Sequence, residues 1–199
     1  MIEAFLIFFM PDLKGLKFLN PLYANIVRLQ VLHVTYQPYR ARQPRVLTVF
    51  PYMLKEFRNR WFLFASKQEN MEQVTLALDR IVEFEVEEGV EYRENPDFDT
   101  EHFFDDVIGV TKSIGESPRD VTFWVSPSSS QYVATKPVHS SQQLVKENED
   151  GSCVFRMRVV VNTEMYSVLM SYGADVRIMY PQKCVNHMRK QLARMGDFY

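Results

Sequence analysis

Between residues 31 and 88 the hydrophobic pattern repeats every two residues, and this feature constrains the fold more than any other. The run VLHVTY, for example, alternates Leu32, Val34 and Tyr36 with more polar neighbours. Such alternation is typical of strands that bury one face and expose the other. Four such runs follow one another, at residues 31–40, 45–54, 60–66 and 73–88. The sequence therefore predicts an antiparallel sheet of four or five strands, strongly bent or closed into a small barrel.

A short helix is expected before these strands. From Leu16 to Leu29 the apolar residues recur at helical spacing, with Leu22 and Ile26 on one face. Pro21 suits the first turn of a helix, where a backbone N–H group would have no partner. The first half of the chain is therefore expected to be a lead helix followed by a sheet.

The second half has a different order of elements, namely strand, helix, strand, strand, helix, strand. The pair Asp150-Gly151 lies between two strand-like runs and indicates a hairpin. This order is that of a ferredoxin-like α+β sandwich, and an amphipathic helix from Pro181 follows it. The predicted elements cover residues 121–126, 129–137, 141–148, 153–161, 163–173 and 175–180.

A connector separates the two halves. Gly89 and Pro96 interrupt the alternating pattern, and Asp99 is a candidate cap for a short helix that ends at Gly109. The fold class predicted from the residues is thus α+β, with two domains. The expected boundaries are a leader at 1–18, a first domain at 19–90, a linker with a short helix at 91–118 and a second domain at 119–199.

Charge is distributed unevenly along the chain. The net charge is only -2, but residues 40–60 hold six basic residues and one acid, whereas residues 83–106 hold eleven acids and one basic residue. Cys153 and Cys184 stand singly in apolar surroundings, which favours buried thiols and a cytoplasmic location over a disulfide framework. The apolar opening MIEAFLIFFM is too short to span a membrane, so no membrane association is expected.

The motifs of catalysis and cofactor binding are missing from the sequence. It contains no glycine-rich phosphate loop, no Cys-x-x-Cys and no G-x-S-x-G, and its four histidines are scattered. We therefore expect neither an enzyme nor a metal site or cofactor, although a site assembled from distant residues stays open.

The stretch KEFRNRWFLFASK, residues 55–67, combines basic residues with large aromatic ones. Arginine suits contacts to phosphate, and neighbouring rings can stack on a base, as in proteins that bind single-stranded nucleic acid. In the alternative interpretation, Trp61 and Leu63 belong to the core while Arg58 and Arg60 are solvated charges on an edge strand. Composition alone favours this second interpretation.

The motifs around this stretch change the balance. VTYQPY, VFPYML, RWFLFAS and LALDRI occur in the order typical of the WYL domain, which the chain resembles from about residue 19 to residue 88. The residues from Thr163 to Leu192 resemble the WCX domain that commonly follows it. The resemblance implies a small Sm-like antiparallel barrel with a lead helix, then the ferredoxin-like domain. It also implies a ligand-sensing module of a bacterial transcriptional regulator, binding single-stranded DNA or a nucleotide.

The site residues that the resemblance implies are carried over one at a time. Tyr36 is the tyrosine of the first strand, Arg58 and Arg60 precede the family's Trp-Tyr-Leu triplet, and Arg80 belongs to the DRI motif. Phe62 replaces the tyrosine of the triplet and therefore lacks a hydroxyl for hydrogen bonding. The expected ligand face consists of these five residues.

One departure from the family leaves a second function open. The family's N-terminal winged helix-turn-helix has no counterpart in the short segment before the lead helix. The chain is therefore expected to be either the sensing part of a longer regulator or a module that acts through a partner. The alternative function is a non-catalytic assembly module that dimerises and works through a DNA-binding partner, and a homodimer is the expected state.

Overall fold

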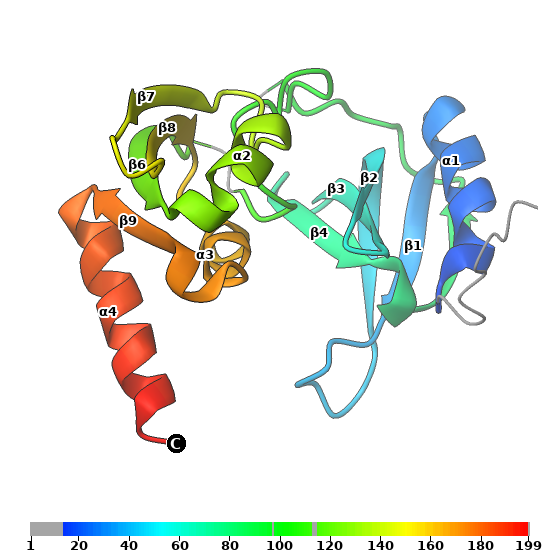
Figure 1. The fold of residues 1–199 in the computed structure, drawn as a ribbon. Coiled ribbons are helices and arrows are strands. Elements are labelled where there is room, and N and C mark those ends of the chain that lie inside the picture. The colour runs from blue at the N-terminus through cyan, green and yellow to red at the C-terminus, as the bar shows by residue number, and fades with distance from the viewer. Residues whose placement is uncertain (1–13, 97, 113–114, 199) are drawn as a thin grey trace, which may run out of the picture. The chain divides into compact units, whose positions relative to one another are not determined.

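The computed structural model describes residues 14–96, 98–112 and 115–198 (Figure 1). The chain divides into two compact units, with the division after Thr100. Both units combine helices with an antiparallel sheet, which confirms the predicted α+β class. Most of the leader expected at residues 1–18 lies outside the described residues.

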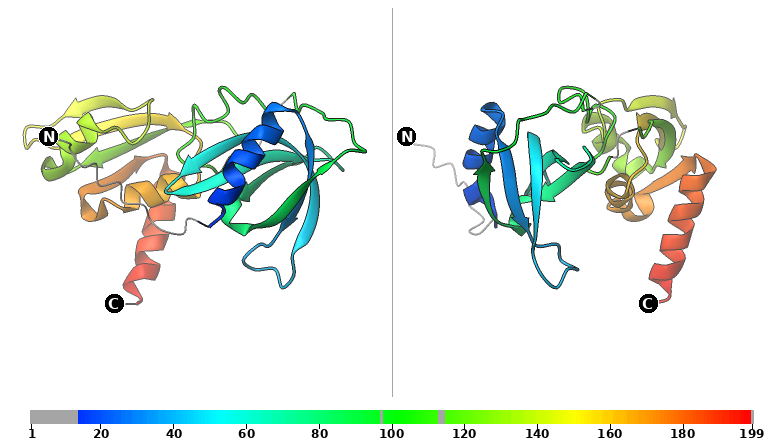
Figure 2. Two further views of the ribbon diagram at one scale, coloured as in Figure 1. Left: turned by 90° about the vertical axis from the view of Figure 1, so that its right-hand side faces the viewer. Right: turned by 180° about the vertical axis from the view of Figure 1, so that it is seen from behind.

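The N-terminal unit contains five antiparallel strands in the order β4-β3-β2-β1-β5. Within the described part of the chain, edge strands β4 and β5 pair only with β3 and β1, so the ladders leave the sheet open. The bent alternative is thus observed, and the strands curve around one face (Figure 2). The strands are β1 (Val31–Tyr36), β2 (Arg45–Phe57), β3 (Arg60–Lys67), β4 (Gln73–Ala77) and β5 (Ile81–Glu87).

The run at residues 73–88 was expected to be one strand, and this prediction is wrong. It is broken by the short 3-10 helix η2 (Leu78–Arg80), because β4 and β5 lie on opposite edges of the sheet and the chain must turn between them. Leu78 is buried at this turn, so the alternating pattern continues although the strand does not. The turn brings Asp79 and Arg80 out of the regular sheet.

Different segments cover the two faces of this sheet. The 3-10 helix η1 (Leu16–Phe18) and α1 (Leu19–Val27) cover one face, where Leu22 is fully buried (Figure 2). On the other face the ring of Tyr92 lies 5.8 Å from that of Phe50, and the two rings meet edge to face. The first part of the connector therefore belongs to the N-terminal unit as a cover of its sheet.

The short helix expected in the linker, capped by Asp99, is absent from the structure. Residues 100–106 form successive turns, in which the N–H groups of Asp105 and Val107 donate to carbonyls three residues back. The ammonium group of Lys112 donates to the carbonyl of Phe103 at 2.9 Å, the acceptor that Val107 would need in an α-helix. The N–H group of Val107 donates instead to the carbonyl of Phe104, so the segment forms turns with hydrogen bonds three residues back and not an α-helix.

The C-terminal unit has the predicted ferredoxin-like order, with a four-stranded antiparallel sheet β7-β8-β6-β9. Helices α2 and α3 bury Val133 and Leu169 in a core that includes the stacked rings of Phe123 and Phe155. The predicted hairpin at Asp150-Gly151 joins β7 to β8. The elements are β6 (Arg119–Val125), α2 (Pro127–Thr135), β7 (Gln143–Glu147), β8 (Cys153–Val159), α3 (Thr163–Met170), the 3-10 helix η3 (Gly173–Asp175), β9 (Val176–Tyr180) and α4 (Gln182–Gly196).

A carboxylate links the start of α2 to the segment before β9. Asp175 accepts hydrogen bonds from the hydroxyls of Ser126, Ser128 and Ser129 at 2.6, 3.0 and 3.1 Å. These hydroxyls hold the pKa of Asp175 below its usual value. A depressed carboxylate pKa stabilises the folded state above the unfolded-state pKa, and the contribution disappears as the pH falls through the folded-state pKa.

Asp175→Asn is therefore expected to lower the denaturant midpoint of unfolding at pH 7 and to have a smaller effect below about pH 4. Urea titrations at several pH values measure this difference. Glu149→Gln, which removes an exposed carboxylate in the same unit, is the matched control. Its difference in denaturant midpoint from the wild type should not become smaller at low pH. A constant difference for Asp175→Asn at all pH values would contradict the assignment.

Candidate ligand-binding site

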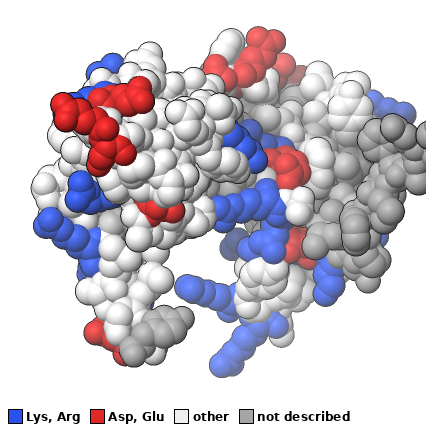
Figure 3. Space-filling view, viewed as in Figure 1, with Lys and Arg blue, Asp and Glu red and all other residues white. Residues whose placement is uncertain are grey.

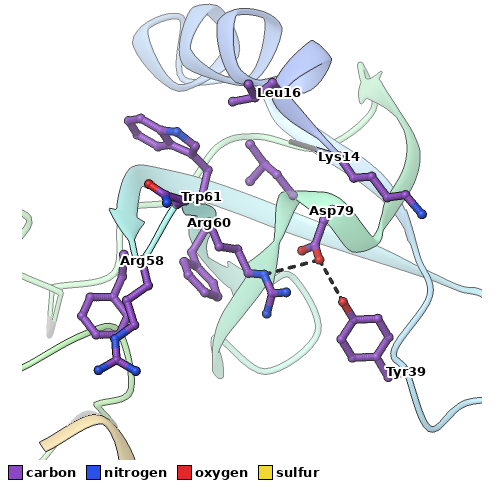
Figure 4. A pocket seen from close by; sticks show the side chains of 11 residues that line it. Lys14, Leu16, Tyr39, Arg58, Arg60, Trp61 and Asp79 are labelled. Atoms are coloured by element: carbon purple, nitrogen blue, oxygen red, sulfur yellow. Dashed lines mark hydrogen bonds and ion pairs between the residues drawn. The ribbon is translucent and has the colours of Figure 1, made fainter. Parts of the chain in front are cut away.

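A pocket of about 700 Å³ lies at the tip of the β2–β3 hairpin (Figure 4). Four segments that are distant in sequence form it, namely the hairpin, the β1–β2 loop, η2 and the start of η1 with the residues just before it. Its volume lies in the range of small-molecule sites. The lining residues are Lys14, Leu16, Tyr39, Phe57, Arg58, Asn59, Arg60, Trp61, Phe62, Leu78 and Asp79.

The tight turn of the hairpin positions the two arginines. Arg58 and Asn59 form a two-residue turn with φ angles of 52° and 60°, the left-handed values that a type I′ hairpin turn needs. The N–H group of Asn59 donates to the carboxylate of Glu56 at 2.6 Å and supports the turn. Arg58 therefore stands at the exposed tip, and Arg60 begins β3 directly after it.

Arg60 shares an acceptor with Tyr39. Its Nε lies 3.4 Å from Oδ2 of Asp79, and the Tyr39 hydroxyl donates to the same oxygen at 3.0 Å, as the dashed lines in Figure 4 mark. The side chain of Asp79 is only 14% exposed, while that of Arg60 is 43% exposed. Asp79 thus offsets one positive charge, and Lys14 and Arg58 leave the pocket with a net positive charge.

Tyr36 and Arg80 are not among the residues that line this pocket. Tyr36 is buried, and its hydroxyl accepts a hydrogen bond from the N–H group of Ala77 at 3.3 Å. The guanidinium of Arg80 lies over the Tyr39 ring, 3.9 Å from its centroid. Burial lowers the pKa of Arg80, but hydrogen bonding to Tyr39 and Tyr36 outweighs it and the net shift is upward. Both residues therefore contact the segments that form the pocket without lining it.

The aromatic residues of the hairpin divide between two tasks. Trp61 packs against the core of the unit and Leu63 is fully buried in it, as the sequence predicted. Phe62 and Phe57 line the pocket and are half-buried. β3 pairs with both β2 and β4 and is an interior strand, so the alternative interpretation is wrong about an edge strand. Arg58 and Arg60 lie before the ladder with β4 begins and are exposed, as that interpretation expected.

The lining residues that sequence reasoning missed include Lys14, Tyr39 and Asp79. Asp79 precedes Arg80 in the LALDRI motif, and Tyr39 lies close to Arg40, so the motif and the basic run were the available signals. Neither signal shows that the two side chains meet, because this depends on the turn at η2. Their proximity is a property of the folded sheet.

A basic surface continues from the pocket onto the β1–β2 loop, where Lys and Arg side chains gather in the lower part of Figure 3. Arg40, Arg42 and Arg45 are all exposed there. The exposed acids Glu83 and Glu85 lie on β5, at the far edge of the sheet from β4. Because β5 pairs with β1, and the basic loop begins where β1 ends, the acidic and basic runs lie on neighbouring elements of the sheet.

Two polar atoms beside the pocket are buried without a hydrogen-bond partner in the described part of the chain. They are Oδ1 of Asp79 and Nε of Arg80. Most buried polar atoms in folded proteins are paired, so each unpaired one needs an explanation, such as strain, a functional role or a bound water or ion. One acceptor and one donor therefore lie unused next to the pocket.

Two classes of site are not observed among the described residues. No group of three or more His, Cys, Asp and Glu side chains is placed to hold a metal ion at 14–96, 98–112 or 115–198. In the same ranges, no helix combines the length and apolar character needed to cross a membrane. Cys153 and Cys184 are free and buried, as the sequence predicted.

Comparisons with solved structures give weak similarity. Proteasome accessory factor B/C (PafBC) of Arthrobacter aurescens matches with a TM-score of 0.37 and 14% identity, over 88% of this chain and 26% of that chain. A CRISPR Cas-related protein matches with a TM-score of 0.49 and 12% identity, over 90% of this chain and 50% of that chain. This chain thus spans half or less of these proteins. No curated protein matches the sequence.

Family models give a direct result. The model of the WYL domain matches residues 17–86, which contain the helix α1 and the five strands of the first sheet except the last residue of β5. The model of the WCX domain matches residues 117–196, which contain the whole ferredoxin-like unit and α4. The chain therefore belongs to the WYL-domain proteins and consists of a WYL domain followed by a WCX domain.

Proposed function

We propose that this chain is the ligand-sensing module of a bacterial transcriptional regulator and that its WYL domain binds single-stranded DNA or a nucleotide. The observation that carries the proposal is the pocket at the hairpin tip, where three cations surround aromatic rings. Lys14, Arg58 and Arg60 supply positive charge, and Phe57 and Phe62 supply flat apolar surface. This combination suits a ligand with phosphate groups and bases.

The existing contacts of Arg60 and Tyr39 suggest how the ligand is held. The Arg60–Asp79 ion pair is partly exposed and therefore weak, so a phosphate group can compete with Asp79 for the guanidinium. Arg58 and Lys14 then contact further phosphates, and Phe62 stacks on a base. Tyr36 and Arg80 contribute by holding Tyr39 and η2 in place.

Binding of a labelled short single-stranded DNA, measured at several salt concentrations, tests the proposal. Arg58→Ala and Arg60→Ala are each expected to weaken binding about tenfold, because each removes a charge-assisted contact. Together they should reduce the slope of log K against log salt by about 1.4, since each contact to a single strand contributes about 0.7.

The matched control removes two arginines from the other unit, Arg189→Ala with Arg194→Ala on α4. It should leave affinity and salt slope near the wild-type values. The proposal fails if the wild type binds neither oligonucleotide nor nucleotide, or if the control weakens binding as much as the hairpin variant does.

The alternative, an assembly module without a ligand, has one observation in its favour. Exposed apolar side chains lie near the C-terminal end of helix α4 and just after it, with Leu192 56%, Met195 46% and Phe198 84% exposed. Such residues are candidates for contact with a second copy of the chain. A mass measurement in solution would show a homodimer, and a dimer that binds neither DNA nor nucleotides would favour this function.

A further inference from the structure

A second pocket, of about 610 Å³, lies entirely within the C-terminal unit. It is formed where the start of α4 meets the beginning of β6, the residues after β8 and the helix α3. Its volume again lies in the range of small-molecule sites. None of the residues in the WYL pocket takes part in it.

Two unpaired cations stand at this pocket. Among the described residues, Arg119 and Lys183 have no carboxylate within ion-pair distance, and both are exposed. His187 adds a third basic group to the lining. Glu116 is the acid that lines the pocket, and its single negative charge offsets one of the two cations. The pocket therefore has an excess of positive charge that the described side chains do not neutralise.

The backbone of α4 reinforces this excess. Pro181 and Lys183 line the pocket at the first turn of a helix that runs from Gln182 to Gly196. No side chain caps this end and no acidic residue lies in the first turn. The free N–H groups and the positive end of the helix dipole thus lie beside the same two cations.

The remaining walls are flat and apolar. The rings of Tyr166 and His187 are stacked, with centroids 4.0 Å apart and planes inclined by 20°. Val160 and Val161 line the pocket beside them, and Cys184 is only 1% exposed. Burial and the neighbouring thiol of Cys184 raise the pKa of Tyr166, so its hydroxyl stays protonated and can donate a hydrogen bond.

We propose that this pocket binds a small organic anion, in which a phosphate or carboxylate group contacts Arg119, Lys183 and the start of α4 while a planar body packs against Tyr166 and His187. The chain then has two anion sites, one in each unit. The second site is independent of the proposed DNA or nucleotide ligand, so the WCX domain can respond to a metabolite of its own.

Calorimetric titration of the full chain with phenyl phosphate, benzoate and inorganic phosphate tests the proposal and distinguishes phosphate from carboxylate. At least one of the two aromatic anions should bind. Arg119→Ala with Lys183→Ala is expected to weaken that binding about a hundredfold, because two charged contacts are removed. Tyr166→Leu should weaken the binding of the aromatic anion but not the binding of inorganic phosphate.

Two controls make the result decisive. The first control, Lys190→Ala with Arg194→Ala, removes two positive charges from α4 outside the pocket. The second, Arg58→Ala with Arg60→Ala, removes the two arginines of the WYL pocket. Neither control should change the binding of the aromatic anion. In nuclear magnetic resonance spectra of the wild type, the ligand should shift the ring signals of Tyr166 and His187. Absence of binding, absence of these shifts, or equal loss in either control would overturn the proposal.

Discussion

Replacing Gly15 by alanine is expected to lower the free energy of unfolding of the N-terminal unit by about 2–5 kcal/mol. The backbone of Gly15 has a φ angle of 91°, and a Cβ atom there would lie 2.3 Å from the carbonyl carbon of Leu78. The obstructing atoms belong to the backbone of η2, which cannot rotate away as a side chain can. The substitution must therefore separate η1 from η2 or distort both.

A second glycine provides a matched control. Gly173 also has a positive φ angle, of 60°, but a Cβ atom there would meet no described atom within 4 Å. Gly173→Ala should lower the free energy of unfolding by only about 1–2 kcal/mol, the cost of the left-handed backbone conformation for alanine. The two tryptophans report on the units separately, because Trp61 lies in the first and Trp124 in the second. Equal losses in urea unfolding would mean that the contact with Leu78 is not formed in solution.

The same contact matters for binding. It fixes Lys14 and Leu16 on one side of the pocket and Asp79 on the other. Loosening it moves one of the three cations and the acceptor of Arg60 at once. Gly15→Ala is therefore also expected to weaken oligonucleotide binding under conditions where the protein remains folded.

The architecture was predictable because its signals are local. Alternation over a few residues predicts each strand, and the Asp150-Gly151 turn predicts one hairpin without knowledge of the rest of the chain. The two errors involve contacts beyond such local patterns. The break at η2 follows from the order of strands in the sheet, and in the linker the carbonyl of Phe103 accepts from the side chain of Lys112 and not from the N–H group of Val107.

The candidate site also combines residues that a local pattern indicated with residues whose positions depend on the fold. Arg58, Arg60 and Phe62 were predicted from one continuous stretch, and the hairpin brings them to one pocket. The positions of Tyr36 and Asp79 depend on strands that pair across the sheet. A sequence pattern therefore indicated which residue types were present but not which side chains faced the solvent.

Asn162→Ala is expected to lower the free energy of unfolding of the C-terminal unit by about 2–4 kcal/mol. The buried side chain caps α3, with Oδ1 accepting from the N–H group of Met165 at 2.8 Å. Its amide group donates to the carbonyls of Ile108 and Thr111 at 2.8 and 2.9 Å. Alanine removes the cap and leaves both carbonyls short of a donor, so the end of the connector separates from α3.

Asn162→Ser distinguishes these two contributions. A serine hydroxyl can still cap α3 but is too short to reach both carbonyls, so it should recover about 1 kcal/mol of the loss. Urea unfolding followed by Trp124 fluorescence should then rank stability as wild type, serine and alanine. If serine restores full stability, the amide contacts with Ile108 and Thr111 contribute nothing, and the connector is held to the WCX domain by its other contacts, among them the hydrogen bond from Thr111 to Glu164.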